Sequence, residues 1–166
     1  KFFREAARRA SETTVENALF NENLAALNAN DASGAAALIK EASGSSRLRE
    51  SILFEQAHYA AKRMAPQAAE LLANFITLAE TPALKTQARL DQVEVALNLN
   101  PPDLETVQAI LPLLEKEQLS PEQTMQLARL NILEAESRQE WPNAIQSCRR
   151  AIALDSEGKQ ADMLYL

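Results

Sequence analysis

The chain has 166 residues, of which 46% are hydrophobic, so it is long and apolar enough to form a substantial core rather than remain disordered. Its net charge of −6 excludes the phosphate-neutralising surface on which nucleic-acid binding depends. Its single cysteine excludes an internal disulfide and a cysteine-based zinc site.

The composition and the spacing of breakers predict an all-α fold. Alanine and leucine dominate, and three glycines are too few for a fold rich in tight hairpins. Prolines and glycines fall mostly 16 to 22 residues apart, the length of one helix and a turn. No segment shows the alternation of a strand. We predict helices over 2–10, 14–29, 32–42, 46–64, 66–79, 83–99, 102–117, 121–139, 142–155 and 159–166.

Two segments carry signals for the start of a helix. Ser120 to Gln123 supplies a capping serine, a proline at the first helical position and a glutamine that completes a capping box. Thr13 to Glu16 also fits a capping box, although a helix that runs unbroken from Phe2 fits equally well. We expect Pro112 to kink or split the helix over 102–117, because proline removes one backbone hydrogen bond.

The two ends of the chain have features of their own. The one basic cluster, Lys1, Arg4, Arg8 and Arg9, is interpreted as a solvated helical face rather than a membrane or nucleic-acid contact. The chain starts without methionine and ends on the apolar residues 163–166, as if inside a helix. We therefore expect a fragment of a longer protein.

A trio of residues spaced +4 and +3 recurs along the chain, at offsets of 33, 39 and 37 residues. These steps keep the three residues on one face of a helix. The four copies are Ala35, Ile39 and Ala42; Ala68, Leu72 and Phe75; Val107, Leu111 and Leu114; and Ala144, Cys148 and Ala151. Three residues before them stand Ala32, Ala65, Leu104 and Trp141. Small residues let a partner helix approach and larger ones fill the adjoining gap, so each copy predicts a packed helix pair.

The last copy, from Trp141 to Asp155, resembles the second helix of a tetratricopeptide repeat. Ala144, Cys148 and Ala151 fall on the small and large packing positions of that family, and Trp141 on its aromatic position. The resemblance implies a right-handed α-solenoid of about four antiparallel helix pairs, preceded by one further helix. The repeats would span 14–42, 46–79, 83–117 and 121–155, with a partial repeat at 159–166, in a single domain over 1–166.

The residue types that support catalysis or metal binding are sparse. His58 forms Glu-x-x-His with Glu55, but one histidine cannot complete a di-iron site or a catalytic dyad elsewhere. Cys148 is interpreted as a small packed hydrophobe rather than a thiol activated by Arg149 and Arg150. Trp141 is assigned to packing rather than ligand binding, and its replacement by alanine would then cost about 3–5 kcal/mol. We expect no cofactor, no metal and no enzymatic activity.

The resemblance implies that the first helix of each pair lines a concave binding surface. Polar residues interrupt the apolar faces of these helices, and we predict that they contact a partner: Gln56, His58, Gln87, Asp91, Gln126 and Asn131. Amide and carboxylate groups of this kind could hold an extended or helical peptide. The hypothesis is therefore a non-catalytic scaffold that binds a protein or peptide, with basic partners weakly favoured by the acidic chain.

Alternatives remain open at this point. The chain could be a helical accessory domain of a larger enzyme, such as one that processes cell walls, or the ligand-sensing domain of a transcription regulator. Self-association through the open ends of a solenoid is a further expectation. No apolar run approaches the roughly 18–20 residues of a membrane span, so we expect a soluble protein, either cytoplasmic or periplasmic.

Overall fold

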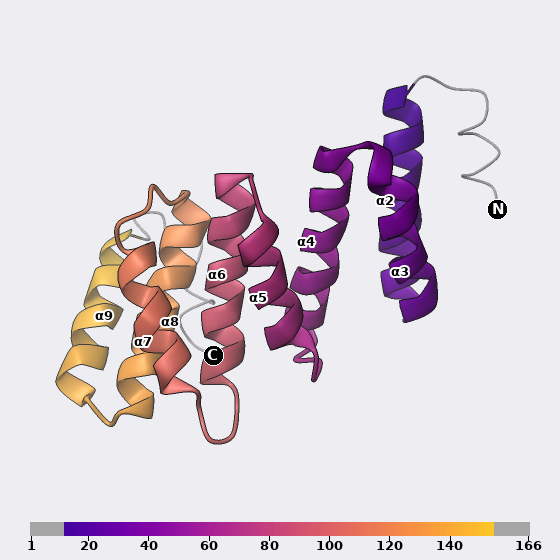
Figure 1. Ribbon diagram of the computed structural model, residues 1–166. Coiled ribbons are helices and arrows are strands. Elements are labelled where there is room, and N and C mark those ends of the chain that lie inside the picture. The colour runs from indigo at the N-terminus through magenta and orange to yellow at the C-terminus, as the bar shows by residue number, and fades with distance from the viewer. Residues whose placement is uncertain (1–11, 155–166) are drawn as a thin grey trace. The chain divides into compact units, whose positions relative to one another are not determined.

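The computed structural model describes residues 12–154, and these residues fold into eight α-helices and one 3₁₀ turn without a strand (Figure 1). The helices are α2 (Glu12–Asn28), α3 (Ala32–Glu41), α4 (Ser46–Lys62), α5 (Ala68–Leu78), α6 (Pro82–Leu97), α7 (Leu104–Leu114), α8 (Pro121–Ser137) and α9 (Trp141–Leu154). The 3₁₀ turn η1 (Ala42–Gly44) follows α3. The predicted all-α class is confirmed. The basic cluster and the helices expected at 2–10 and 159–166 lie outside the described residues.

The chain divides into two compact units between Thr81 and Pro82. In the first unit α2 packs against α3 and α4, and α4 also packs against α3 and α5. In the second unit α6 packs against α7 and α8, and α8 also packs against α7 and α9. Each unit therefore holds two of the predicted repeats, and in both the first helices of the two pairs are in contact.

The repeated trio supplies much of the core in the first unit. Of its six positions here, five are buried and Ile39 is partly buried. Ala42 forms a cluster with Leu48 and Ile52 of α4, which Ile39 also joins. Phe75 of α5 lies with its ring centroid 5.5 Å from that of Phe54. The apolar stripes predicted by the spacing are thus the faces through which these helices pack.

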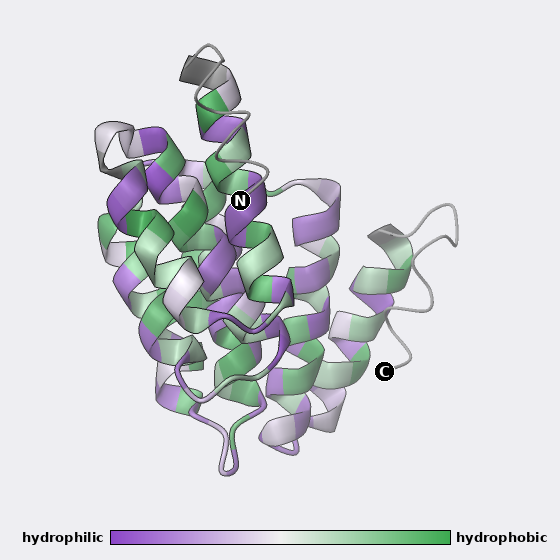
Figure 2. Ribbon diagram, turned by 90° about the vertical axis from the view of Figure 1, so that its right-hand side faces the viewer, coloured by the Kyte–Doolittle hydropathy of each residue, from purple (hydrophilic) through white to green (hydrophobic). Residues whose placement is uncertain are grey.

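The second unit buries the trio in two clusters. Val107, Leu111 and Leu114 of α7 join residues of α6 and α8 in the larger cluster. Ala151 of α9 joins residues of α8 in a smaller cluster, and Cys148 packs against it while partly buried. Colouring by hydropathy shows hydrophobic and hydrophilic residues alternating along the helices (Figure 2), as amphipathic helices require.

Trp141 does not take the packing role that its position in the repeat predicts. Its side chain is 57% exposed, so the predicted burial is wrong. Helix α9 faces α8 with the edge that carries Ala144 and Ala151, which are 5% and 0% exposed. Trp141 stands three positions before Ala144, so its side chain is rotated about 60° from that of Ala144 around the helix axis. At the first turn of α9 this rotation leaves the indole outside the core.

Three of the helix-to-helix turns share one geometry that the sequence pattern did not reveal. Asn30, Met64 and Gln139 follow α2, α4 and α8 closely and have φ of 56°, 50° and 60°. In each turn the residue after the one with positive φ donates its N–H to the carbonyl five residues before it, for example Ala65 to Ala60 at 2.9 Å. This is the Schellman motif, in which glycine usually occupies the position with positive φ. Because none of these three positions is a glycine, the glycines of the sequence do not mark the turns.

The start signal at Ser120 is confirmed. The Ser120 hydroxyl accepts from the Gln123 N–H at 3.2 Å, and the Ser120 N–H donates to the Gln123 side chain at 3.1 Å. Of the two outcomes expected at Pro112, a kink or a split, the split does not occur. Helix α7 continues through Pro112 and ends at Leu114, because a proline near the end of a short helix disturbs only the last turn.

Candidate functional site

Three of the four residues predicted to contact a partner in the second unit, Gln87, Asp91 and Gln126, bind one another. The Gln87 side-chain amide donates to Oε1 of Gln126 at 3.0 Å and to Oδ1 of Asp91 at 3.2 Å. Gln123 donates to Oε1 of Gln87 at 3.3 Å. These bonds join α6 to α8, so the amides serve the contact between the two helices.

The same network extends one turn further along α6 and α8, past the buried Asp91. Gln126 donates to Glu94 at 3.4 Å, and Arg129 lies 3.5 Å from the other carboxylate oxygen of Glu94. Asp91 is 1% exposed. A carboxylate covered by its own unit presents little surface to another molecule, so this structure does not support the predicted contact of Asp91 with a partner.

The first unit uses its predicted contact residues in a similar way. The Gln56 amide donates to Oδ1 of Asn23 and to the carbonyl of Ala35, both at 2.9 Å. His58 stacks on Phe54, one turn earlier in α4, with ring centroids 5.4 Å apart and an interplanar angle of 19°. Gln56 is partly exposed and also lines a cleft, so it keeps access to a ligand.

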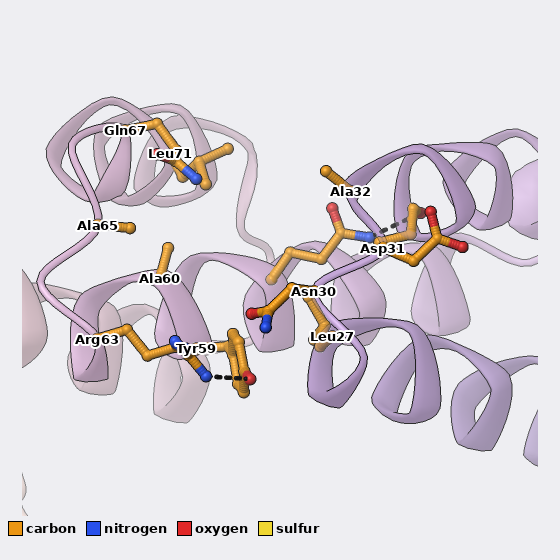
Figure 3. A pocket seen from close by; sticks show the side chains of 12 residues that line it. Leu27, Asn30, Asp31, Ala32, Tyr59, Ala60, Arg63, Ala65, Gln67 and Leu71 are labelled. Atoms are coloured by element: carbon orange, nitrogen blue, oxygen red, sulfur yellow. Dashed lines mark hydrogen bonds between the residues drawn. The ribbon is translucent and has the colours of Figure 1, made fainter.

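That cleft is the candidate site of the first unit, with a volume of about 260 Å³ (Figure 3). It lies where α2 ends, α3 and α5 begin, and the last turns of α4 pass. Its apolar walls and its polar groups are supplied by Leu27, Asn30, Asp31, Ala32, Ala35, Gln56, Tyr59, Ala60, Arg63, Ala65, Gln67 and Leu71. Two of the Schellman turns border it, so the backbone geometry that closes these turns also shapes the cleft.

The donors of the cleft are only partly engaged. Arg63 donates to the Tyr59 hydroxyl at 2.9 Å (Figure 3) and lies 5.4 Å from the centroid of the Tyr59 ring. A guanidinium carries five N–H donors, so most remain directed to solvent. Gln67 precedes α5 without capping it through its side chain. Arg63 and Gln67 therefore offer donors to a ligand at the cleft.

Asp31 is committed to its own helix. The Gly34 N–H and the Ser33 hydroxyl each donate to its carboxylate at 2.9 Å, and these bonds lower the pKa of Asp31 below its ordinary value. The carboxylate caps α3 and stays ionised near neutral pH. The cleft thus carries one negative group, whose Oδ1 already accepts two hydrogen bonds, and one positive group, Arg63, with free donors.

A second, shallower cleft in the second unit has a volume of about 480 Å³. Asn131 lines it, and this is the one predicted contact residue near it. Its other walls are Glu115, Glu117, Leu119, Thr124, Leu127, Ala128, Ser147 and Arg150. Glu117 is already bound by Thr86 and Arg89. The lining of this cleft has less apolar surface than that of the first unit, so it suits an apolar peptide side chain less well.

The described residues contain no group of three histidine, cysteine, aspartate or glutamate side chains that could hold a metal ion. Over residues 12–154, no helix is both long and apolar enough to cross a membrane. No family model, curated protein or solved structure matches the chain.

Asn30, Tyr59, Arg63 and Gln67 were missed as site residues by the sequence reasoning. They lie in or next to turns, whereas the residues predicted from the sequence lie on the faces of the first helices. One feature of the sequence could have indicated them: Asn30 and Met64 stand just after two amphipathic helices, where a residue in the left-handed conformation reverses the chain. Side chains beside such turns meet at one end of a helix pair.

Proposed function

We propose that the chain is a non-catalytic interaction module built of helix pairs, and that the cleft of the first unit binds an extended peptide segment of a protein partner. The observation that carries the proposal is the cleft itself, where apolar walls stand beside a cation with free donors. A peptide needs an apolar pocket for a side chain and polar partners for its backbone or its charged groups.

The residues divide these tasks between them. Leu27, Ala60 and Leu71 offer the wall for one small apolar side chain. Arg63 is held near Tyr59 by a hydrogen bond and by the face of the ring, so it loses little freedom on meeting a carboxylate or a carbonyl. A volume of about 260 Å³ suits one or two peptide side chains better than a large cofactor.

The proposal includes the tetratricopeptide-like arrangement that the Trp141–Asp155 segment suggests. In that arrangement the pairs stack as a right-handed α-solenoid of antiparallel helices. Contacts between α2 and α4, and between α6 and α8, support it, since stacked pairs bring their first helices together. The turns at Asn30, Met64 and Gln139 support it too, because they repeat one connection.

The test uses a substitution that fills the cleft without entering the core. Ala32 is exposed and lines the cleft, whereas Ala37, on the same helix, is exposed and does not line it. Peptides are selected from a random display library on the parent chain, synthesised with a fluorescent label, and titrated by anisotropy. Ala32→Trp should weaken binding at least about tenfold, and Ala37→Trp should leave it unchanged.

Arg63→Gln gives a second readout with the same peptides. It should weaken peptides with a carboxylate more than their amidated or neutral counterparts, because the charge is lost while the stem of the side chain remains. The proposal fails if no peptide is enriched on the parent, or if enriched peptides bind the Ala32→Trp variant as tightly as the parent.

A further inference from the structure

Helix α9 carries a stripe of large apolar side chains that its contact with α8 leaves uncovered. Trp141, Ile145 and Ile152 are 57%, 54% and 65% exposed, and Cys148 between them is half-buried. At 100° per residue the four side chains lie within about 60° around the helix axis. The stripe runs beside the buried edge of Ala144 and Ala151 and extends along most of the helix.

The corresponding helix of the preceding pair lacks such a stripe. The equivalents of Ile145 and Ile152 in the preceding pair are Gln108 of α7 and Glu115, the residue that follows α7, and both are exposed polar residues. The equivalent of Cys148 is Leu111, which is 8% exposed in a cluster with Leu127 and Leu130 of α8. The apolar residues Ile145 and Ile152 thus distinguish α9 from α7.

The spacing of the stripe is symmetric. The steps from Trp141 to Ile145, Cys148 and Ile152 are 4, 3 and 4 residues, the same in both directions along the helix. Two such helices laid antiparallel place Trp141 opposite Ile152 of the other copy, and Ile145 opposite Cys148. This is the 3–4 spacing of helices that pack at a small crossing angle. A stripe that matches itself in this way fits a two-fold interface.

We infer that α9 is the surface through which this chain pairs with a second copy of itself, antiparallel and in that register. Charge does not oppose the pairing, because α9 contains no acidic residue, Arg149 lies beside the stripe and Arg150 lies on the opposite side of the helix. In this register Arg149 is level with Ala144 of the other copy, five residues along the helix from that copy's Arg149.

The interface is small. Four partly exposed side chains remove on the order of 800 Å² from water in total, which is the range of weak and reversible complexes. The dimer is therefore expected to dissociate on dilution to low micromolar concentrations, and the experiment must extend to high protein concentration.

Sedimentation equilibrium of the full chain, from micromolar to near-millimolar concentration, tests the inference directly. The parent should show a monomer–dimer equilibrium. Ile145→Glu should abolish the dimer, because it places a carboxylate against Cys148 of the other copy. Gln146→Glu is the matched control, since it adds the same charge at an exposed position outside the stripe and should dimerise like the parent.

The single cysteine and a charge pair test the register. A short bis-maleimide can join two chains only at Cys148, and it should do so in the parent and in Gln146→Glu but not in Ile145→Glu. Trp141→Glu and Ile152→Lys should each be monomeric alone and should form a heterodimer when mixed, because the two charges then face each other. Circular dichroism checks that each variant keeps its helices.

Two results would overturn the inference. One is a parent chain that stays monomeric throughout the concentration range, with a Cys148 thiol equally reactive at all concentrations. The other is a failure of the charge variants to behave as this register requires. Either a dimer that persists in Ile145→Glu, or a mixture of Trp141→Glu and Ile152→Lys that forms no dimer, would mean that the contact lies elsewhere.

Discussion

The side-chain amide of Gln56 donates to Oδ1 of Asn23 at 2.9 Å and so joins α4 to α2 across 33 residues of sequence. The same amide donates to the carbonyl of Ala35, at the first buried position of the repeated trio. Asn23 is 0% exposed, and its Nδ2 has no hydrogen-bond partner among the described residues. One partly exposed glutamine therefore satisfies two acceptors in the interior of the first unit.

Removing this glutamine should destabilise the first unit. Gln56→Ala leaves the Asn23 oxygen without its donor and removes the second, side-chain donor from the helical carbonyl of Ala35, and the expected loss is about 1–3 kcal/mol in the free energy of unfolding. Gln67→Ala, at an exposed position of the same unit, should change it by less than about 0.5 kcal/mol. Urea unfolding followed by circular dichroism measures both.

Replacing both partners should recover much of that loss. In the double variant Asn23→Leu with Gln56→Leu, no amide is left unpaired between α2 and α4, so its stability should lie closer to the parent than that of Gln56→Ala. If the double variant were the least stable of the three, the network would contribute more than the pairing of buried polar groups.

The left-handed residue after α4 should be improved by glycine. Met64 has φ of 50° and is 43% exposed, so Met64→Gly removes the clash of its Cβ and little buried surface. The expected gain is about 0.5–1 kcal/mol, after the greater freedom of glycine in the unfolded chain is deducted. Asn30→Gly is the comparison and should gain less, because asparagine tolerates this conformation. Thermal unfolding that ranks the two in the opposite order would contradict this account of the turns.

The carboxylate of Glu50 should make the first unit sensitive to acid. Partial burial raises the pKa of Glu50, but donation from the Thr81 hydroxyl and N–H and from the Glu80 N–H outweighs it, so the net pKa lies below the ordinary 4.5. A pKa that folding depresses stabilises the folded state above the unfolded pKa, and the contribution is lost as the pH falls through the folded value.

Glu50→Gln should therefore lower the free energy of unfolding by about 1–2 kcal/mol at neutral pH, a figure already reduced for solvent screening. The gap between parent and variant should shrink as the pH falls below 4.5. Urea unfolding from neutral pH to about pH 3.5 measures it, with Glu55→Gln on the same helix as the control. A gap that widens in acid would show that the bonds to Thr81 and Glu80 do not favour the ionised form.

Two substitutions in α9 separate its buried edge from its exposed stripe. Ala144→Leu enlarges a residue that is 5% exposed and should cost about 1–3 kcal/mol through overpacking against α8. Trp141→Ala, three residues earlier, should cost less than about 0.5 kcal/mol in the monomer, because the indole is 57% exposed. Thermal melts at low protein concentration compare them, and a large loss for Trp141→Ala would mean that the indole packs in the folded chain.

The contacts that the predicted site residues make within the chain follow less directly from the sequence than the helices do. Gln56, Gln87 and Gln126 lie on helix faces that point toward neighbouring helices, and Asp91 lies in the interior. An amide in an apolar pattern can serve a partner or another amide of the same chain, and the pattern is the same in both cases. Only the distance between two helices decides which occurs.

The sequence by itself determined where the helices begin and end and which edges of them are buried. Capping residues, prolines and the +4 and +3 steps act within one or two turns, so Ser120, Ala68 and Ala151 could be placed without knowledge of the rest of the chain. The tertiary structure alone decided that Gln56 meets Asn23, that Trp141 lies outside, and that the cleft forms beside Arg63. Each depends on which segments, tens of residues apart, come into contact, and that is set by the packing of whole helices rather than by local preference.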